Sequence, residues 1–341
     1  MKRIESKAPT RIDLAGGTID LWPIHQLLEN PMTVNFGISL FAKVSIELRE
    51  KQDFELLSAD FSKSVKGSFE DVVNSRELPL ISYFLKHYWS SQWQGLRITT
   101  VAGSPPGAGL GGSSALAIAL SAALVEARHQ LHGVSKPDEH TLVATARDLE
   151  ARIIFAPTGV QDYWGALRGG LNELCFLPGL TEVHTHREGV CFEELERELI
   201  VCYSGQSRAS AINNWEIFKK LFDGDQQTHS SLQSIADCAR TCARELRLGQ
   251  LQNASEASRQ EWDIRCGLWP GVETEVTKAI SKNALSAGAN LVRVCGAGGG
   301  GVMAILVDPS KRQKVLQSLA LTDAKVLDAH LVKQGVEVQC L

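Results

Sequence analysis

Apolar and polar residues alternate along two stretches near the start of the chain. The first stretch covers residues 2–7. The second covers residues 33–49, where the apolar positions are Val34, Phe36, Ile38, Leu40, Val44, Ile46 and Leu48. A period of two puts alternate side chains on one face, which is typical of a half-buried β-strand. Short apolar runs predict further strands at 96–101, 199–203, 291–294 and 302–307.

Helical patterns lie between the predicted strands. Residues 79–89 and 138–154 each show a helical pattern, and a proline and a glycine end the second one. The Ala- and Leu-rich residues 113–130 form a third predicted helix, which is apolar on nearly every side. A helix without a polar face is normally buried, so this helix should lie in the core. Residues 211–286 carry several more helical segments.

The chain has 341 residues, which is more than one hydrophobic core usually serves. A Pro178-Gly179 turn followed by a charged stretch at 193–198 marks the predicted boundary between two parts. We therefore predict two closely packed α+β domains, residues 1–190 and residues 191–341.

Composition limits the classes of partner. The net charge is −4 and the sequence pI is about 6.2, so no bulk basic field exists to hold nucleic acid or an anionic membrane. No signal-peptide pattern begins the chain, and no apolar run approaches the roughly 18 residues of a membrane span. The eight cysteines include no CxxC pair, which favours reduced thiols. We expect a cytoplasmic monomer or homodimer whose partner is a small molecule.

A glycine-rich segment, PPGAGLGGSSA at 105–115, joins a predicted strand to the buried helix. The start of a helix leaves about four backbone N–H groups unpaired and carries roughly half a positive charge. Glycines let this backbone approach a phosphate closely, so the segment can form an anion cradle. The candidate phosphate-binding residues are Pro106, Gly107, Ala108, Gly109, Leu110, Gly111, Gly112, Ser113 and Ser114.

Other interpretations of this segment can be weighed from its residues. Gly107, Gly109 and Gly112 also satisfy the dinucleotide pattern GxGxxG, but that pattern requires a second strand after the helix, and here a turn and another helix follow. A P-loop would need a lysine, which the segment lacks. A tight turn that binds nothing stays open, with Ser113 and Ser114 capping the helix rather than offering hydroxyl groups to phosphate or Mg²⁺.

The segment resembles the phosphate-binding motif of the GHMP kinase superfamily, which includes galactokinases, homoserine kinases and mevalonate kinases. Two further segments resemble motifs of this family in the same order, APTRIDLAGGTID at 8–20 and GAGGGG at 296–301. RIDLAGGTID, LRGGLN at 167–172 and YSGQSRAS at 203–210 are similar to the branch that contains D-glycero-D-manno-heptose 7-phosphate kinase and fucokinase. The resemblance covers essentially the whole chain.

The resemblance implies a fold and an activity. The N-terminal domain should be α+β and similar to domain 2 of ribosomal protein S5, with a left-handed βαβ unit, and the C-terminal domain should be ferredoxin-like. ATP should lie between the domains with its phosphates on residues 105–114. The implied function is an ATP-dependent small-molecule kinase that phosphorylates a hydroxyl group of a sugar or sugar phosphate, with Mg²⁺.

The resemblance also implies roles for individual residues. Asp162 would act as catalytic base, with Arg11 beside it, because a fixed positive charge favours an ionised carboxylate and stabilises phosphoryl charge. Ser114 and Glu150 match the Mg²⁺ ligands of the family, and Mg²⁺ commonly takes one or two protein oxygens. From the residues alone, Asp162 could cap a helix, Arg11 could lie at the surface, and Glu150 could be an exposed helical carboxylate.

The implied substrate-binding residues are Asp20, Thr18, Gly17, Arg208, Gly298 and Gly299. Gly17 and Thr18 replace a Glu and a His that recognise the sugar in galactokinases, which argues against galactose. Asp20 would accept hydrogen bonds from sugar hydroxyl groups. Arg208 could meet a substrate phosphate, although a surface ion pair explains it equally well. Heptose phosphate, fucose and another sugar all stay open as acceptors.

Two other functions stay open. The first is a kinase for mevalonate or homoserine, and Arg11 argues against mevalonate kinase, where a lysine is usual. The second is a non-catalytic sensor that binds ATP and a sugar on the same fold. Such a sensor could lose Arg11, Asp162 or the Mg²⁺ ligands, yet all are present.

Overall fold

The computed structural model of this chain describes residues 3–105, 107–207 and 210–341. Two of the predicted site residues, Pro106 and Arg208, lie outside the described residues.

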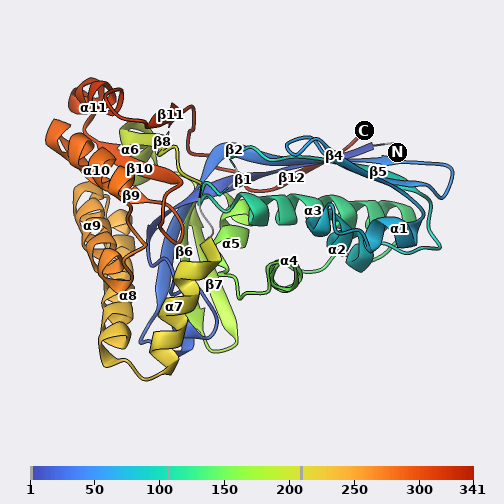
Figure 1. The fold of residues 1–341 in the computed structure, drawn as a ribbon, viewed down its shortest axis with the longest axis horizontal. Coiled ribbons are helices and arrows are strands. Elements are labelled where there is room, and N and C mark those ends of the chain that lie inside the picture. Colours follow the sequence, from blue (N-terminus) through green and yellow to red (C-terminus); the bar gives the residue numbers. More distant parts are fainter. Residues whose placement is uncertain (1–2, 106, 208–209) are drawn as a thin grey trace.

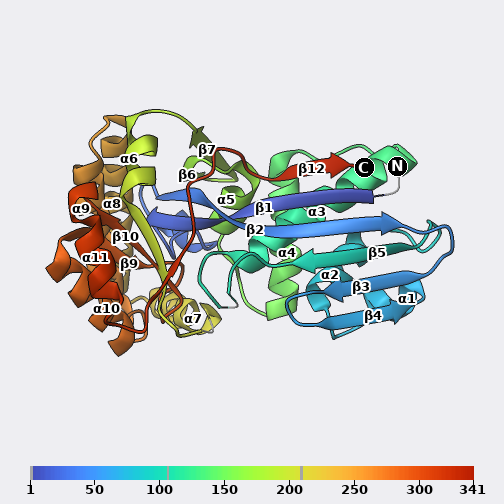
Figure 2. The same ribbon diagram turned by 90° about the horizontal axis from the view of Figure 1, so that it is seen from above.

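Eight strands form the larger of two sheets. They are β1 (Arg3–Ala15), β2 (Met32–Leu48), β3 (Phe54–Ser58), β4 (Lys63–Gly67), β5 (Leu96–Val101), β6 (Leu171–Leu177), β7 (Leu180–His186) and β12 (Glu337–Cys340). The strand order is β12-β1-β2-β5-β3-β4, and the β6–β7 hairpin joins the start of β2. All these pairs are antiparallel except β3 with β5. Figure 2 shows the strands from β12 to β4 side by side.

Helices cover one face of this sheet. They are α1 (Phe69–Val73), α2 (Pro79–Tyr88), α3 (Gly112–His132), α4 (Glu139–Ile154) and α5 (Gln161–Arg168), and a short 3-10 helix spans Ile24–Leu27. α3 runs beneath β1 and β2, and its Ala- and Leu-rich surface is largely buried, as the sequence predicts (Figure 1). The apolar face of the sheet therefore packs on α3, which carries the glycine-rich loop at its start.

The smaller sheet belongs to the second half of the chain. Its strands have the order β11-β8-β10-β9 and are β8 (Leu199–Tyr203), β9 (Ala289–Val294), β10 (Val302–Val307) and β11 (Lys325–Leu327). The accompanying helices are α6 (Val190–Glu198), α7 (Ser210–Phe222), α8 (Gln226–Arg247), α9 (Leu251–Leu268), α10 (Glu275–Ala287) and α11 (Arg312–Leu319), with a 3-10 helix at Pro309–Lys311. Figure 1 shows this part at one end of the molecule.

The two halves share part of their core. One hydrophobic cluster contains Ile12 and Phe36 from the larger sheet together with Ala239 of α8 and Ala304 of β10. The second half of β1 is buried throughout, because α5 of the first half and α8 and α9 of the second all contact it. Charged residues in this half of β1 are therefore held in a low-dielectric environment.

The structure confirms the α+β class and most of the predicted elements. The predicted strands 96–101, 199–203 and 302–307 have the predicted bounds, and the helices at 79–89, 113–130 and 138–154 correspond to α2, α3 and α4. The division of the chain at residue 190 stays a prediction. The smaller sheet begins at Leu199, and β12 returns to pair with β1, so the two ends of the chain lie side by side (Figure 2). Within the described ranges, no helix is long and apolar enough to cross a membrane.

Candidate active site

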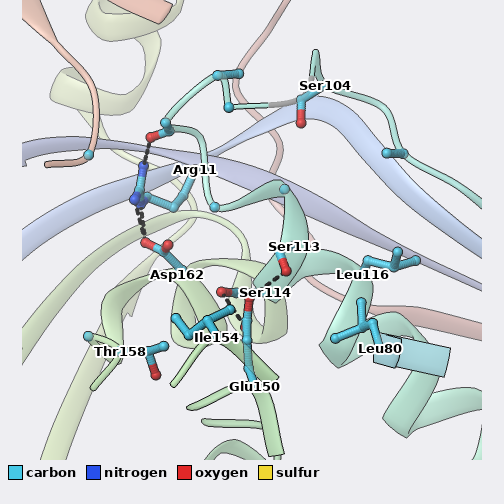
Figure 3. A pocket seen from close by; sticks show the side chains of 18 of the residues that line it. Arg11, Leu80, Ser104, Ser113, Ser114, Leu116, Glu150, Ile154, Thr158 and Asp162 are labelled. Carbon is cyan, nitrogen blue, oxygen red and sulfur yellow. Dashed lines mark hydrogen bonds and ion pairs between the residues drawn. The ribbon is translucent and has the colours of Figure 1, made fainter. Parts of the chain in front are cut away.

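A cavity of about 750 Å³ lies where the glycine-rich loop, β1 and the loop after β9 meet. Its walls come from the second half of β1 and the turn that follows, from the start of α3, and from the adjoining ends of α4 and α5. Gly296 and Ala297 close it from the second half of the chain. Most of the predicted site residues that lie far apart in the sequence therefore face one cavity (Figure 3).

The glycine-rich loop bends sharply before α3. Gly107, Gly109 and Gly111 all have a positive φ, between 67° and 78°, which is the conformation that glycine adopts without strain. α3 begins at Gly112, and no side chain caps its N-terminus. The N–H groups of its first turn have no intrahelical acceptor, so they are available to an anion.

Arg11 and Asp162 are in direct contact. The Arg11 Nε donates to Asp162 Oδ1 at 2.6 Å, and its Nη2 contacts the same oxygen. The Nη1 donates to the carbonyl oxygen of Gly109 at 2.7 Å, which ties the guanidinium to the glycine-rich loop (Figure 3). Burial acts to lower the pKa of Arg11, but Asp162 and Asp13 outweigh it and hold that pKa above its ordinary value. Asp162 lies in the first turn of α5, where Val160 is the N-cap, so it does not cap the helix.

Glu150 joins α4 to the start of α3. Ser114 Oγ donates to its carboxylate at 2.9 Å, Ser113 Oγ also donates to it, and Tyr163 Oη donates at 2.7 Å. The serine hydroxyl groups therefore bind a carboxylate rather than cap α3. Burial raises the pKa of Glu150 above its ordinary value, although the three hydroxyl groups act in the opposite direction.

Asp20 also lines the cavity. It is buried and accepts hydrogen bonds from the Gln161 backbone N–H at 3.1 Å and from its side-chain amide at 3.5 Å. A Cβ atom on Gly159 would come within 1.9 Å of Asp20 Oδ2, so only glycine lets the carboxylate approach this closely. Burial, and then the charge of Asp162, raise the pKa of Asp20 to about 6.

Other predicted residues have different surroundings. Thr18 lines the cavity, with a positive φ of 74° that is unusual for a residue other than glycine. Gly17 faces Arg265, since a Cβ there would lie 2.3 Å from that guanidinium, and it is not among the cavity-lining residues. Leu110 is fully buried, while Gly298 and Gly299 pack against Val272. Among the glycines of the 296–301 loop, Gly296 faces the cavity instead.

Several cavity residues were not predicted from the sequence. Gln161 lines the cavity beside the predicted base, and no motif in the sequence marks it. The buried Tyr163 lies outside the lining and donates to Glu150. Leu80, Leu116 and Ile154 also line the cavity, with no motif in the sequence to mark them; Leu80 and Leu116 lie together on one side of it (Figure 3).

The chain is similar to known proteins over its whole length. Residues 78–170 match the GHMP kinases N terminal domain. The chain is 24% identical over 343 residues to the D-glycero-alpha-D-manno-heptose 7-phosphate kinase of Campylobacter jejuni, with 99% of each chain covered. It is 25% identical over 338 residues to the bifunctional fucokinase/GDP-fucose pyrophosphorylase of Arabidopsis thaliana, covering 93% of this chain but 31% of that longer protein.

The fold is also found in solved structures. A D-glycero-D-manno-heptose 1-phosphate kinase from Bacteroides thetaiotaomicron superposes with a TM-score of 0.76 at 20% identity, covering 99% of each chain. The matched domain contains the glycine-rich loop and Asp162, and the relatives extend the match over both halves of the chain. This chain therefore contains a match to the GHMP kinases N terminal domain at residues 78–170, and over its whole length it is similar to a heptose 7-phosphate kinase.

Proposed function

We propose that this protein transfers the γ-phosphoryl group of ATP to a hydroxyl group of a sugar or sugar phosphate. The observation that carries the proposal is the contact between Arg11 and Asp162 beside the phosphate loop, inside the cavity. The similarity to a heptose 7-phosphate kinase and to a bifunctional fucokinase supports a heptose 7-phosphate or a fucose-like acceptor.

The shape of the cavity suits ATP. The triphosphate would lie on the loop 107–112 and the first turn of α3, where glycine backbone and unpaired N–H groups favour anions. Leu80, Leu116 and Ile154 line the same cavity and offer apolar surface that suits a purine ring. The acceptor would occupy the end near Thr18 and Asp20, where the carboxylate can accept hydrogen bonds from hydroxyl groups.

In the proposed reaction the acceptor hydroxyl oxygen attacks the γ-phosphorus of ATP. The new P–O bond forms as the bond to the β–γ bridging oxygen breaks, and ADP leaves. Asp162 takes the proton of the hydroxyl group as general base. Arg11 stabilises the charge on the transferred phosphoryl group, and because its guanidinium is already held by Asp162 and Gly109, little reorganisation is needed.

Mg²⁺ fits the residues at the start of α3. Glu150 and Ser114 offer a carboxylate and a hydroxyl oxygen, which are the hard donors that this ion prefers. When bound, Mg²⁺ would neutralise charge on the phosphates. A cation here would also favour the ionised form of Glu150, whose pKa is raised by burial.

The proposal is tested by ADP release from the purified chain with ATP, Mg²⁺ and single acceptors. The panel contains heptose 7-phosphate, heptose, fucose, galactose, mevalonate and homoserine. We expect turnover with a heptose phosphate or fucose and background rates with mevalonate and homoserine. Turnover with mevalonate or homoserine alone would overturn the sugar assignment, and saturable ATP and sugar binding without ADP release would make the protein a sensor.

A further inference from the structure

Four charged side chains form a buried cluster behind Arg11. The cluster consists of Asp13 on β1, Glu261 and Arg265 on α9, and Arg293 on β9, and each of the four is at most 1% exposed. Trp262 covers both guanidinium groups, with its ring 5.6 Å from Arg265 and 5.8 Å from Arg293. Removing so many charges from water costs free energy, and apolar residues could fill the same volume.

Asp13 connects this cluster to the cavity. Its Oδ2 accepts hydrogen bonds from Arg265 at 3.0 Å and from Arg293 at 3.1 Å. Its Oδ1 accepts the backbone N–H of Gly296 at 2.8 Å and lies 3.7 Å from Arg11 Nη1. One carboxylate therefore contacts both the Arg11 guanidinium and the loop residue that closes the cavity.

The chain geometry fixes this relation. Arg11 and Asp13 are two residues apart on β1, so their side chains share one face of the strand. Burial acts to raise the pKa of Asp13, but Arg293, Arg11 and Arg265 outweigh it and hold that pKa below its ordinary value. Asp13 is thus a permanent negative charge among three guanidinium groups. Without it, no carboxylate would contact both Arg11 and the two buried arginines, among the interactions of the described residues.

Glu261 offers an internal comparison. It is as buried as Asp13 and pairs with the same two arginines, at 3.5 Å from Arg265 and 3.0 Å from Arg293. Its remaining acceptor contacts go to the backbone N–H groups of Gly16 and Gly17. Unlike Asp13, it has no contact with Arg11 or Gly296 among the interactions of the described residues.

We propose that Asp13 is a positioning residue for phosphoryl transfer, which holds the Arg11 guanidinium and the loop beginning at Gly296 in their working arrangement. Arg265 assists, because it donates to Asp13 and also to the carbonyl oxygen of Gly296. The inference rests on the proposed function, and its test separates the two.

The test compares Asp13→Asn with Glu261→Gln. Each variant keeps the side-chain size and removes one negative charge from the same arginine pair. We expect kcat per folded enzyme to fall about 10–100-fold in Asp13→Asn, since displacement of a reacting group by about 1 Å costs roughly that much. Glu261→Gln should lower the melting temperature by about as much as Asp13→Asn does, but its kcat should stay within about threefold of the wild type. A purely structural role would lower the melting temperature of both and change kcat in neither.

A double-mutant cycle identifies the route of the effect. If Asp13 acts through Arg11, adding Asp13→Asn to Arg11→Lys should lower kcat by less than threefold, while independent effects would multiply. If Asp13→Asn does not fold, Arg265→Lys replaces it, because lysine keeps the charge but cannot hold Asp13 and Gly296 together. We expect a threefold to tenfold loss of kcat there.

The outcomes are distinct. A wild-type chain without turnover on any acceptor would overturn the proposed function and this inference with it. If the wild type is active, an unchanged kcat in Asp13→Asn would overturn this inference but not the proposed function. An equal loss of kcat in Glu261→Gln and Asp13→Asn would do the same.

Discussion

Two aspartates only seven positions apart on the chain have opposite environments. Asp13 lies among three guanidinium groups, which hold its pKa below the ordinary value despite burial. Asp20 is also buried, but the charge that acts on it most strongly is another carboxylate, Asp162, so burial and repulsion together raise its pKa to about 6. The same residue type can therefore serve as a fixed charge at one position and as a titrating group at the other.

The pKa of Asp20 predicts a pH dependence. In the proposed function the ionised form would accept hydrogen bonds from an acceptor sugar, and this form predominates only above about pH 6. At pH 5 about a tenth of the molecules carry ionised Asp20, so kcat/KM for the acceptor should fall about tenfold from its value at pH 7. The KM for ATP should change little over the same range. Steady-state kinetics between pH 5 and 8 measure both.

The variant Asp20→Asn is the control, and it also tests the direction in which Asp20 changes stability with pH. Between pH 3.8, the ordinary pKa of an aspartate, and about pH 6, Asp20 is protonated in the folded state but ionised in the unfolded state. The free energy of unfolding therefore falls as the pH rises through this window. Asp20→Asn should therefore raise the free energy of unfolding at pH 7 by up to about 3 kcal/mol, with no gain at pH 3.5. It should also remove the acid limb of the acceptor profile. An unchanged limb would mean that another group titrates.

At the scale of elements, the start of α3 is joined to α4 and α5 through one carboxylate. Ser113 and Ser114 come from α3, Glu150 from α4 and Tyr163 from α5, and all three hydroxyl groups donate to Glu150. The glycine-rich loop is thus fixed by the helices on both sides of the cavity. A ligand that binds Glu150 acts directly on the helix start that faces the phosphates.

The proposed metal role of Glu150 gives a prediction at this scale. Glu150→Gln keeps the size and the hydrogen-bonding oxygen but removes the anionic donor, so the Mg²⁺ concentration for half-maximal turnover should rise about tenfold or more. Asp148→Asn is the matched control, since Asp148 lies on the same helix with its side chain 60% exposed. A titration of turnover with Mg²⁺ measures both variants. Equal Mg²⁺ dependence in Glu150→Gln and the wild type would remove Glu150 from the metal site.

The elements themselves were largely predictable from the sequence. Their apolar spacing is local, so the strands at 96–101 and 302–307 and the buried helix after the glycine-rich loop followed directly from it. The hairpins β3–β4 and β6–β7 were missed. β4 reads KSVKG and is mostly exposed, so it lacks the apolar alternation that marks a half-buried strand.

At the scale of the whole molecule, the pairing of distant segments was not predictable from local patterns. β12 pairs Cys340 with Ile4 across nearly the entire chain, and no turn or spacing in the sequence specifies that register. The Asp13 cluster draws on residues 13, 261, 265 and 293, each of which alone resembles an ordinary surface charge. The glycine pattern located the glycine-rich loop, and the resemblance to GHMP kinases singled out Arg11 and Asp162, but neither gave a sign of the charges behind them.

The arrangement of the whole molecule brings Arg11 from the N-terminal strand and Asp162 from the middle of the chain together beside the phosphate loop. The most direct test of this account is the turnover number of Asp162→Asn, measured with ATP and the preferred acceptor, alongside its dissociation constant for ATP. The account predicts that kcat falls about 10²–10⁴-fold while the dissociation constant stays within about threefold of the wild type. A variant that keeps near-wild-type turnover would contradict it.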